Sequence, residues 1–128
     1  MKGKQKFYYC RRCGNIAGLI NDSGIPMICC GEKMIELVPN TAEASTEKHL
    51  PAVEISGDNI SVQIGSVPHP MESGHHIAFV YIETEHGGQR KSLSAGDEPG
   101  ASFVLSGDRA VAAYAYCNLH GLWKTEIQ

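Results

Sequence analysis

Short segments of alternating apolar and polar residues, or of clustered β-branched residues, dominate the chain from about residue 52 onward. Turn signals such as SGDN, HGG and SGDR separate them. The segments are residues 52–56, 60–65, 75–83, 89–94, 101–105, 110–116 and 122–127. Seven short strands at this spacing predict an antiparallel β-sandwich.

The segment HIAFVYIE shows the alternation most clearly. Successive side chains of a strand point to opposite faces. One face is therefore expected to carry Ile77, Phe79 and Tyr81, and the other Ala78, Val80 and Ile82. Because both faces are largely apolar, this strand is predicted to lie in the centre of its sheet.

The N-terminal part of the chain lacks the regular series of strand-like segments found after residue 52. Residues 1–38 contain short apolar runs around an NDSG turn, which predicts a small β module. A piece of this size cannot bury enough apolar surface to fold by itself, and usually needs a metal, disulfides or a partner. We expect this module, then a polar linker of mild helical character at residues 39–48 within a sandwich domain that extends to residue 128.

Composition adds limits on function. The 128 residues are 42% hydrophobic and 20% charged, with a net charge of -3, as in an ordinary soluble globular protein. No basic stripe for nucleic acid and no glycine-rich phosphate loop is visible. The N-terminus, MKGKQKFYYC, has no apolar stretch of signal-peptide or membrane-span length, so a cytoplasmic protein is expected. Clustered cysteines in a reducing compartment favour metal binding or redox chemistry.

The first candidate site contains four cysteines. A CxxC pair followed by Gly14 is typical of a metal knuckle, and two cysteine pairs can form a tetrahedral site for zinc or a single iron. The second pair is adjacent in sequence, so both thiols reach one metal only if the chain kinks there. These residues are Cys10, Cys13, Cys29 and Cys30.

The second candidate site combines histidines with the remaining cysteine, all in or next to predicted loops. Cys117 and His120 form a CxxH pair, and His69 stands between two prolines that suggest a rigid loop. Zinc prefers four ligands, whereas five ligands with one open position suit iron better. The five candidates are His49, His69, His75, Cys117 and His120.

In combination, five motifs resemble those of desulfoferrodoxin, the two-iron class of superoxide reductase. They are CRRCG, ICCG, EKHLP, HPMESGH and CNLHGLW, and the resemblance covers essentially the whole chain. It implies an all-β fold, with a desulforedoxin-like (rubredoxin-like) metal module followed by a seven-stranded immunoglobulin-like sandwich related to neelaredoxin. The implied activity is reduction of superoxide to hydrogen peroxide without release of oxygen, which detoxifies superoxide.

The resemblance also implies two iron ions per chain. The four N-terminal cysteines would bind the first iron in a rubredoxin-like centre. The second iron would have four histidines in a plane and Cys117 on the axis, with the opposite position open. Of the adjacent His75 and His76, the spacing from the HPM motif selects His75, and His76 and His86 are expected to be ordinary exposed histidines.

Two residues beside His49 are expected to take part in catalysis. Lys48 would attract superoxide, because the overall charge of -3 does not favour an anion. Glu47 would occupy the open position of the oxidised iron and leave it on reduction, as the resemblance implies. The resemblance further implies a homodimer and an electron donor such as rubredoxin or a similar small iron protein. It leaves open whether the first iron passes electrons to the second or braces the fold.

Two alternatives come from other functional classes. A blue-copper electron carrier would use two histidines, a cysteine and usually a methionine, but no methionine follows His120 and the histidines are too many. A zinc-knuckle interaction module would explain the first half of the chain and give the HPM and CNLH loops no role. Metal content separates these alternatives from a two-iron protein.

Overall fold

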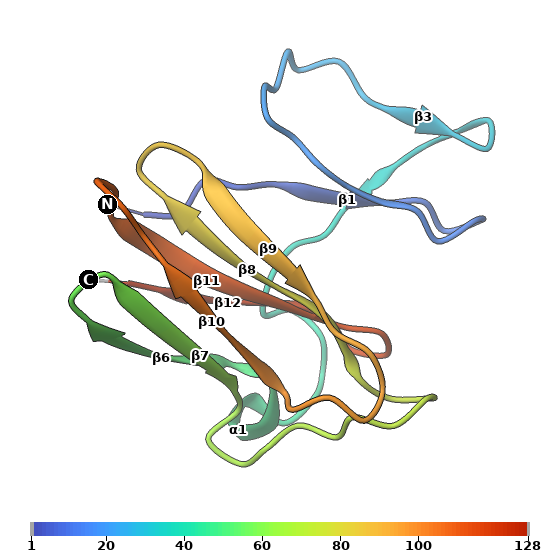
Figure 1. Cartoon of the computed structure of the whole chain (residues 1–128). Coiled ribbons are helices and arrows are strands. Elements are labelled where there is room, and N and C mark those ends of the chain that lie inside the picture. The colour runs from blue at the N-terminus through green and yellow to red at the C-terminus, as the bar shows by residue number, and fades with distance from the viewer. Residues whose placement is uncertain (1, 128) are drawn as a thin grey trace. The chain divides into compact units, whose positions relative to one another are not determined.

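The computed structural model describes residues 2–127, which form two units (Figure 1). The smaller unit is Lys4–Val38, and the larger one begins at Pro39. Gly3 also belongs to the larger unit. Its amide donates to Glu126 Oε1 at 2.8 Å, and its carbonyl accepts from Lys124 Nζ at 2.9 Å.

The larger unit contains all seven predicted strands, arranged in two antiparallel sheets (Figure 1). One sheet has the order β10-β7-β6, and the other has the order β12-β11-β8-β9. The strands are β6 (Pro51–Ser56), β7 (Asn59–Ile64), β8 (Ile77–Thr84), β9 (Gly88–Ser92), β10 (Gly100–Val104), β11 (Ala110–Cys117) and β12 (Gly121–Glu126). The expected all-β architecture, a cysteine module followed by a sandwich, is confirmed.

The core of the sandwich follows from the alternation along its strands. Ile60, Val62 and Ile64 of β7 are buried, while the residues between them are exposed. They share one hydrophobic cluster with Val80 and Ile82 of β8 and with residues of β10 and β11. As predicted, β8 lies inside its sheet, between β11 and β9.

One detail of β8 differs from the sequence pattern. Simple alternation predicted that Ile77 shares a face with Phe79 and Tyr81. In the structure it belongs to the core cluster of Val80 and Ile82 instead. The register between β8 and β11 shifts at this point, since Tyr116 pairs with Phe79 but Cys117 pairs with Ile77. Such an irregularity re-aims side chains at the end of a strand. Here it affects the strand end that carries Cys117.

The smaller unit has short strands and almost no core. Of its residues, all of which are described, only Phe7 and Cys10 are buried. One sheet has the order β2-β1-β5, and a separate hairpin joins β3 to β4. The strands are β1 (Phe7–Tyr9), β2 (Ile16–Gly18), β3 (Ile28–Cys29), β4 (Glu32–Lys33) and β5 (Ile35–Glu36).

The polar linker carries one short helix, α1 (Thr46–His49), in agreement with its expected mild helical character. Its start is fixed at Asn40, whose side chain donates to the Lys124 carbonyl at 3.1 Å and accepts from the Lys124 amide at 2.8 Å. The linker is therefore hydrogen-bonded to β12 before it reaches the helix. No helix among the described residues is long and apolar enough to cross a membrane.

Candidate metal centres

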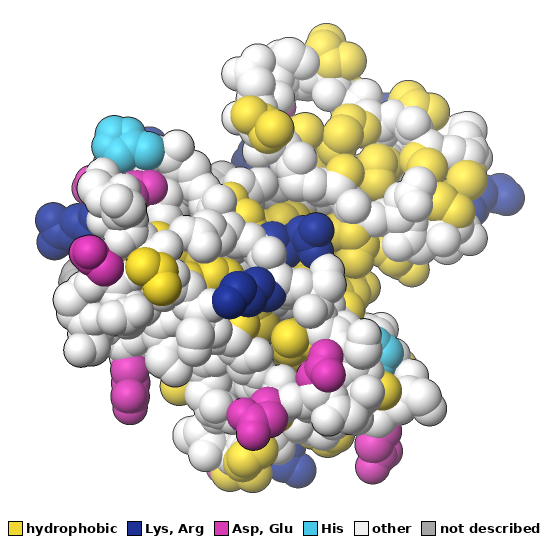
Figure 2. All heavy atoms as spheres, viewed as in Figure 1, with side chains coloured by type: hydrophobic (Ala, Val, Ile, Leu, Met, Phe, Trp, Pro, Cys, Tyr) yellow, Lys and Arg dark blue, Asp and Glu magenta, His cyan; other side chains and the backbone are white. Residues whose placement is uncertain are grey.

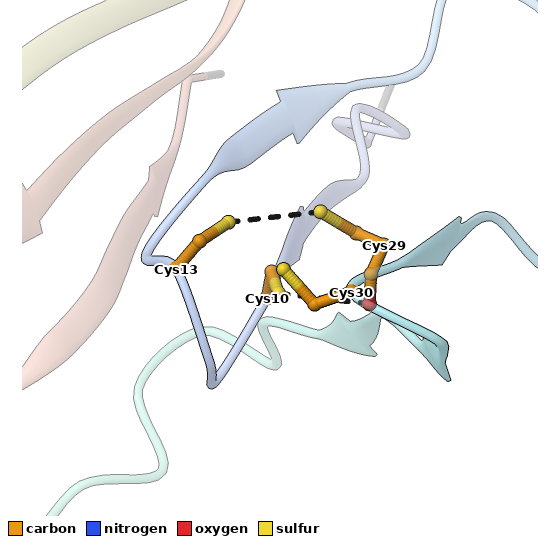
Figure 3. A group of neighbouring side chains, drawn as sticks. All are labelled: Cys10, Cys13, Cys29 and Cys30. Carbon is orange, nitrogen blue, oxygen red and sulfur yellow. Dashed lines mark hydrogen bonds between the residues drawn. The ribbon is translucent and has the colours of Figure 1, made fainter.

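The four cysteines of the smaller unit come together in one cluster (Figure 3). Their sulfur atoms all lie within 4.8 Å of one another. The first pair is presented by a tight turn, in which the Gly14 amide donates to the Cys10 carbonyl at 2.8 Å. Gly14 has a φ of 82°, a conformation that favours glycine. This turn is the metal knuckle that the CxxCG motif predicts.

The second pair shows the kink that two adjacent ligands require. Cys30 has a φ of 52°, in the left-handed region that residues other than glycine seldom adopt. The backbone thus turns sharply after β3, and the side chains of Cys29 and Cys30 both point toward the first pair (Figure 3). Cys13 Sγ lies 3.6 Å from Cys29 Sγ. The strained turn allows neighbours in sequence to serve one centre.

The electrostatics of this cluster fit a bound cation. The backbone amide of Cys13 donates to the Cys10 thiol and is the main cause that lowers the pKa of Cys10 to about 6. The neighbouring Cys13 thiol and the other cysteines raise the pKa of Cys30 to about 12. Four thiolates this close repel one another unless a metal balances their charge, and thiolate sets of this kind select zinc or iron.

The second cluster lies at the end of the sandwich and is built from three separate segments of the chain. His49 ends α1, His69 lies in the loop between β7 and β8, and His75 precedes β8. Cys117 ends β11, and His120 follows in the turn to β12. The structure therefore brings all five predicted ligands of the second site to one place.

The four imidazole rings form a closed square. Neighbouring ring centroids are 4.6 Å apart for His49 and His69, 4.7 Å for His69 and His75, 5.1 Å for His75 and His120, and 5.0 Å for His120 and His49. Neighbouring rings are nearly perpendicular, with interplanar angles of 76° to 88°. His49 and His75 occupy opposite corners, 6.4 Å apart.

The outer nitrogens of two rings are held by backbone carbonyls. His49 Nδ1 lies 2.6 Å from the Ser45 carbonyl, and His69 Nδ1 lies 2.7 Å from the Pro70 carbonyl. Because a carbonyl can only accept, each Nδ1 must carry the proton, and each Nε2 keeps its lone pair. Metal-binding histidines are oriented in this way in proteins.

The inner nitrogens of the rings converge on one another. His49 Nε2 lies 3.2 Å from His69 Nε2 and 3.2 Å from His120 Nδ1. His75 Nε2 is buried and has no hydrogen-bond partner. A cation bound between the rings would satisfy all these lone pairs, so the residues present fit a metal ion.

A thiol completes this set. Cys117 is fully buried, and its Sγ lies 3.8 Å from His120 Nδ1. Ligand atoms of His49, His69, His75 and Cys117 lie within 4.8 Å of one another. A set of four imidazoles and one thiolate exceeds the tetrahedral preference of zinc and suits iron.

Burial favours the neutral form of two of the four imidazoles. Removal from water lowers the pKa of His49, and it lowers the pKa of His69 to about 4. The lone pairs are thus available for a metal at neutral pH, because protonation of these rings is disfavoured.

The two predicted catalytic residues lie beside this site on α1. Glu47 and Lys48 are both exposed, and they directly precede the buried His49. The Glu47 carbonyl accepts from the Val67 amide at 3.0 Å and from Ser66 Oγ at 3.2 Å. The backbone that carries the two side chains is thus attached to the loop that carries His69.

The other two histidines lie outside the square. His76 Nδ1 lies 3.0 Å from the Glu72 carbonyl, and the His76 amide donates to Asn118 Oδ1 at 2.8 Å. Asn118 also donates to the Gly74 carbonyl at 3.1 Å. Asn118 therefore connects the segment before β8 to the turn that carries His120. His86 is exposed, at the turn between β8 and β9.

Sequence reasoning did not assign a role to Trp123, which supports two ligands. Its ring stacks on His49 with centroids 4.9 Å apart, and its Nε1–H donates to the His120 carbonyl at 3.1 Å. Gly65 was also missed. Its amide donates to the Leu50 carbonyl at 3.0 Å, and a Cβ there would lie 2.4 to 2.8 Å from backbone oxygens of Val67 and the α1 segment. The signal for Trp123 was its place in the CNLHGLW motif.

The fold and the two donor sets define a β-sandwich protein with two non-haem iron centres, one of four cysteines and one of four histidines and a cysteine. The chain belongs to the desulfoferrodoxin family, whose model matches residues 41–126.

Relatives and solved structures agree with this assignment. A desulfoferrodoxin homolog from Archaeoglobus fulgidus is 41% identical over 92% of this chain and 94% of that protein. A desulfoferrodoxin from Nitratidesulfovibrio vulgaris is 38% identical over 98% of this chain and 99% of that protein. The superoxide reductase from Treponema pallidum is similar in structure, with a TM-score of 0.81 and 33% identity over 97% of this chain and 100% of that one.

Proposed function

We propose that the chain is a superoxide reductase that converts superoxide to hydrogen peroxide without releasing oxygen. The observation that carries this proposal is the square of four histidines with a buried cysteine beside it. These five residues would hold one iron, which can take a sixth ligand and so could bind a substrate there. The Treponema pallidum protein, similar over nearly the whole chain, is a superoxide reductase.

The ligand assignment is part of this proposal. The second, catalytic iron is held by His49, His69, His75, His120 and Cys117, and the first iron by the four cysteines of the smaller unit. Support comes from the converging lone pairs of the second cluster and from the kinked turn that aims Cys29 and Cys30 at the first pair.

The reaction consumes one electron and two protons for each superoxide and yields one hydrogen peroxide. Bound iron supplies the electron, and the thiolate of Cys117 increases its tendency to donate. Lys48 attracts the anionic substrate and orients water for proton delivery. Its exposed position next to His49 supports this role, since the net charge of -3 makes local steering necessary. The carboxylate of Glu47 would bind the iron in its oxidised state.

Metal analysis combined with optical spectra tests the proposal. The purified protein is expected to contain two irons per chain and to show two thiolate-to-iron bands. Cys117→Ser should remove one band together with superoxide reduction, and Cys13→Ser should alter the other band only. One copper or one zinc per chain would contradict the proposal.

The two α1 side chains need separate tests. Lys48→Ala should lower the second-order rate with superoxide at low ionic strength, and added salt should reduce the difference because it screens the charge. An unchanged rate would show that Lys48 does not steer. Glu47→Ala should change the spectrum of the oxidised site across pH, and an unchanged spectrum would exclude the carboxylate as a ligand.

We also propose that the chain is a homodimer that receives electrons from rubredoxin or a similar small iron protein. Five large apolar side chains of the smaller unit are exposed, namely Ile20, Ile25, Ile28, Ile35 and Val38. Figure 2 shows hydrophobic side chains on the surface of this unit, as expected where a second copy binds. Sedimentation tests the dimer, and stopped-flow reduction by candidate donors tests the partner.

A cytoplasmic location is proposed because all five cysteines lie in candidate metal sites, a use of cysteine that is typical of a reducing compartment. Thiols remain reduced in that compartment.

A further inference from the structure

The metal knuckle of the smaller unit contains two arginines between its cysteines, and both bind one carboxylate. Arg11 Nη2 donates to Glu32 Oε1 at 2.5 Å, and Arg11 Nε donates to Glu32 Oε2 at 3.3 Å. Arg12 Nε donates to the same Oε2 at 2.8 Å. Three N–H groups thus engage both oxygens of Glu32, which is the strong, directional form of this interaction.

These contacts join the two halves of the first centre. The arginines lie between Cys10 and Cys13, whereas Glu32 follows Cys30 by two residues, in β4. The ion pairs therefore connect the first cysteine pair to the turn that carries the second pair. Glu32 remains ionised, because hydrogen bonds from Arg11 and then Arg12 lower its pKa.

The charge of this group complements that of the centre. Two guanidinium groups and one carboxylate leave one net positive charge on residues that neighbour the cysteines in sequence. Four thiolates around a trivalent iron carry one negative charge, and reduction adds a second. A nearby positive charge therefore stabilises the reduced form more than the oxidised form, and net charge is one of the factors that set the potentials of iron–sulfur centres.

Solvent limits the size of this effect. The Arg11 and Arg12 side chains are 63% and 62% exposed, and Glu32 is 30% exposed. A single exposed ion pair contributes little to stability. The clamping effect must therefore come from both arginines binding the same carboxylate.

We propose that Arg11, Arg12 and Glu32 form a charge clamp that raises the reduction potential of the first iron and holds the Cys29–Cys30 turn against the Cys10–Cys13 knuckle. The inference rests on the proposed iron in the four-cysteine site. It gives the arginines of this chain a positioning and tuning role, so that a weaker reductant suffices to reduce the first centre.

A redox titration of the full chain, followed at the thiolate-to-iron band of the first centre, tests the clamp. The double variant Arg11→Gln, Arg12→Gln should decrease the ratio of reduced to oxidised first iron at a fixed potential by about three- to tenfold. This corresponds to a negative shift of roughly 30–60 mV at 59 mV per tenfold for one electron. Glu32→Gln removes the negative charge and should shift the potential in the opposite direction.

Lys6→Gln is the matched control. It removes a positive charge from the same unit, where Lys6 pairs with Asp22 at 3.5 Å and not with the clamp. Its potential should stay close to that of the wild type. The double variant Arg11→Lys, Arg12→Lys keeps the charge but loses the forked geometry, so it should keep the potential and lose metal to a chelator several-fold faster.

Two results would overturn the inference. In the first, the reduction potential of the Arg11→Gln, Arg12→Gln variant shifts no more than that of Lys6→Gln. In the second, the potentials of the arginine variant and of Glu32→Gln shift in the same direction, which indicates general loosening of the site. A first site that shows no redox step at all would instead contradict its assignment as iron, and with it the tuning role. The redox step of the wild type separates these two kinds of failure.

Discussion

The two units of this chain gather metal ligands in opposite ways. In the smaller unit the ligands come from two tight turns, at Cys10–Cys13 and at Cys29–Cys30, and only two residues of the unit are buried. In the larger unit they come from segments between His49 and His120, at the end of a sandwich with a continuous core. The first centre thus depends on local backbone conformation, and the second depends on the packing of segments that are distant in sequence.

Removal of metal is expected to have the largest effect and to separate the two units. Without metal, the smaller unit should unfold, because it has too little core and a structural four-ligand site supplies on the order of 10 kcal/mol in small zinc domains. The sandwich should stay folded. Amide hydrogen exchange of the chelated protein should show loss of protection in β1 and β2 and retained protection in β8 and β11. Equal loss in both units would contradict the comparison.

A cavity in the core should destabilise the larger unit alone. Ile82 is fully buried, and Ile82→Ala should lower the free energy of unfolding of the sandwich by about 2–5 kcal/mol in urea titrations. Ile20→Ala is the matched control in the smaller unit. Because Ile20 is completely exposed, its truncation should change stability by less than about 0.5 kcal/mol. Similar losses for both variants would mean that the smaller unit has a core of its own.

The contact between two ligand loops can be broken at Gly65. Its φ is 84°, and an added Cβ would lie 2.4 Å from the Val67 carbonyl oxygen. Gly65→Ala should cost about 1–3 kcal/mol and accelerate loss of the second iron to a chelator, because the His49 and His69 segments are displaced.

Gly57→Ala provides the comparison for that variant. Gly57 also has a positive φ, 59°, but a Cβ there would meet nothing within 4 Å. Gly57→Ala should lower the free energy of unfolding only by the backbone strain, about 1–2 kcal/mol, and leave the rate of iron loss unchanged. If both variants lose iron at the same rate, close approach at Gly65 does not position the ligands.

The smallest expected effect concerns Trp123. Trp123→Phe keeps an aromatic ring beside His49 but removes the hydrogen bond to the His120 carbonyl, at a cost of about 1 kcal/mol. The spectrum of the second centre should shift, and that of the first should not. Thr125→Val, which removes a hydrogen bond from the same strand to the Pro51 carbonyl, should cost a similar amount without any spectral change. A spectral shift in both variants would mean that the shift comes from a change in β12 as a whole and not from Trp123.

Much of the fold and of the candidate sites could be predicted from the sequence. Alternation identified all seven strands of the sandwich, because one face of each strand must pack on a core. Alternation failed at Ile77, because a register shift between strands depends on the partner strand, which no local pattern contains. The adjacent Cys29 and Cys30 predicted a kink, and the left-handed conformation of Cys30 provides it.

The residue types and spacings alone determined which side chains could bind metal and that the cysteine module would need a metal, disulfides or a partner to fold. Motif resemblance then grouped the distant histidines. The resemblance also implied that the four histidines share a plane. Only the tertiary structure decided how they are held there, with outer nitrogens bound by the Ser45 and Pro70 carbonyls and with Trp123 against His49. It also decided that two arginines meet one glutamate beside the first centre. Local sequence sets the conformation of a turn, whereas the distance between residues far apart in the chain is set by the packing of the elements that carry them.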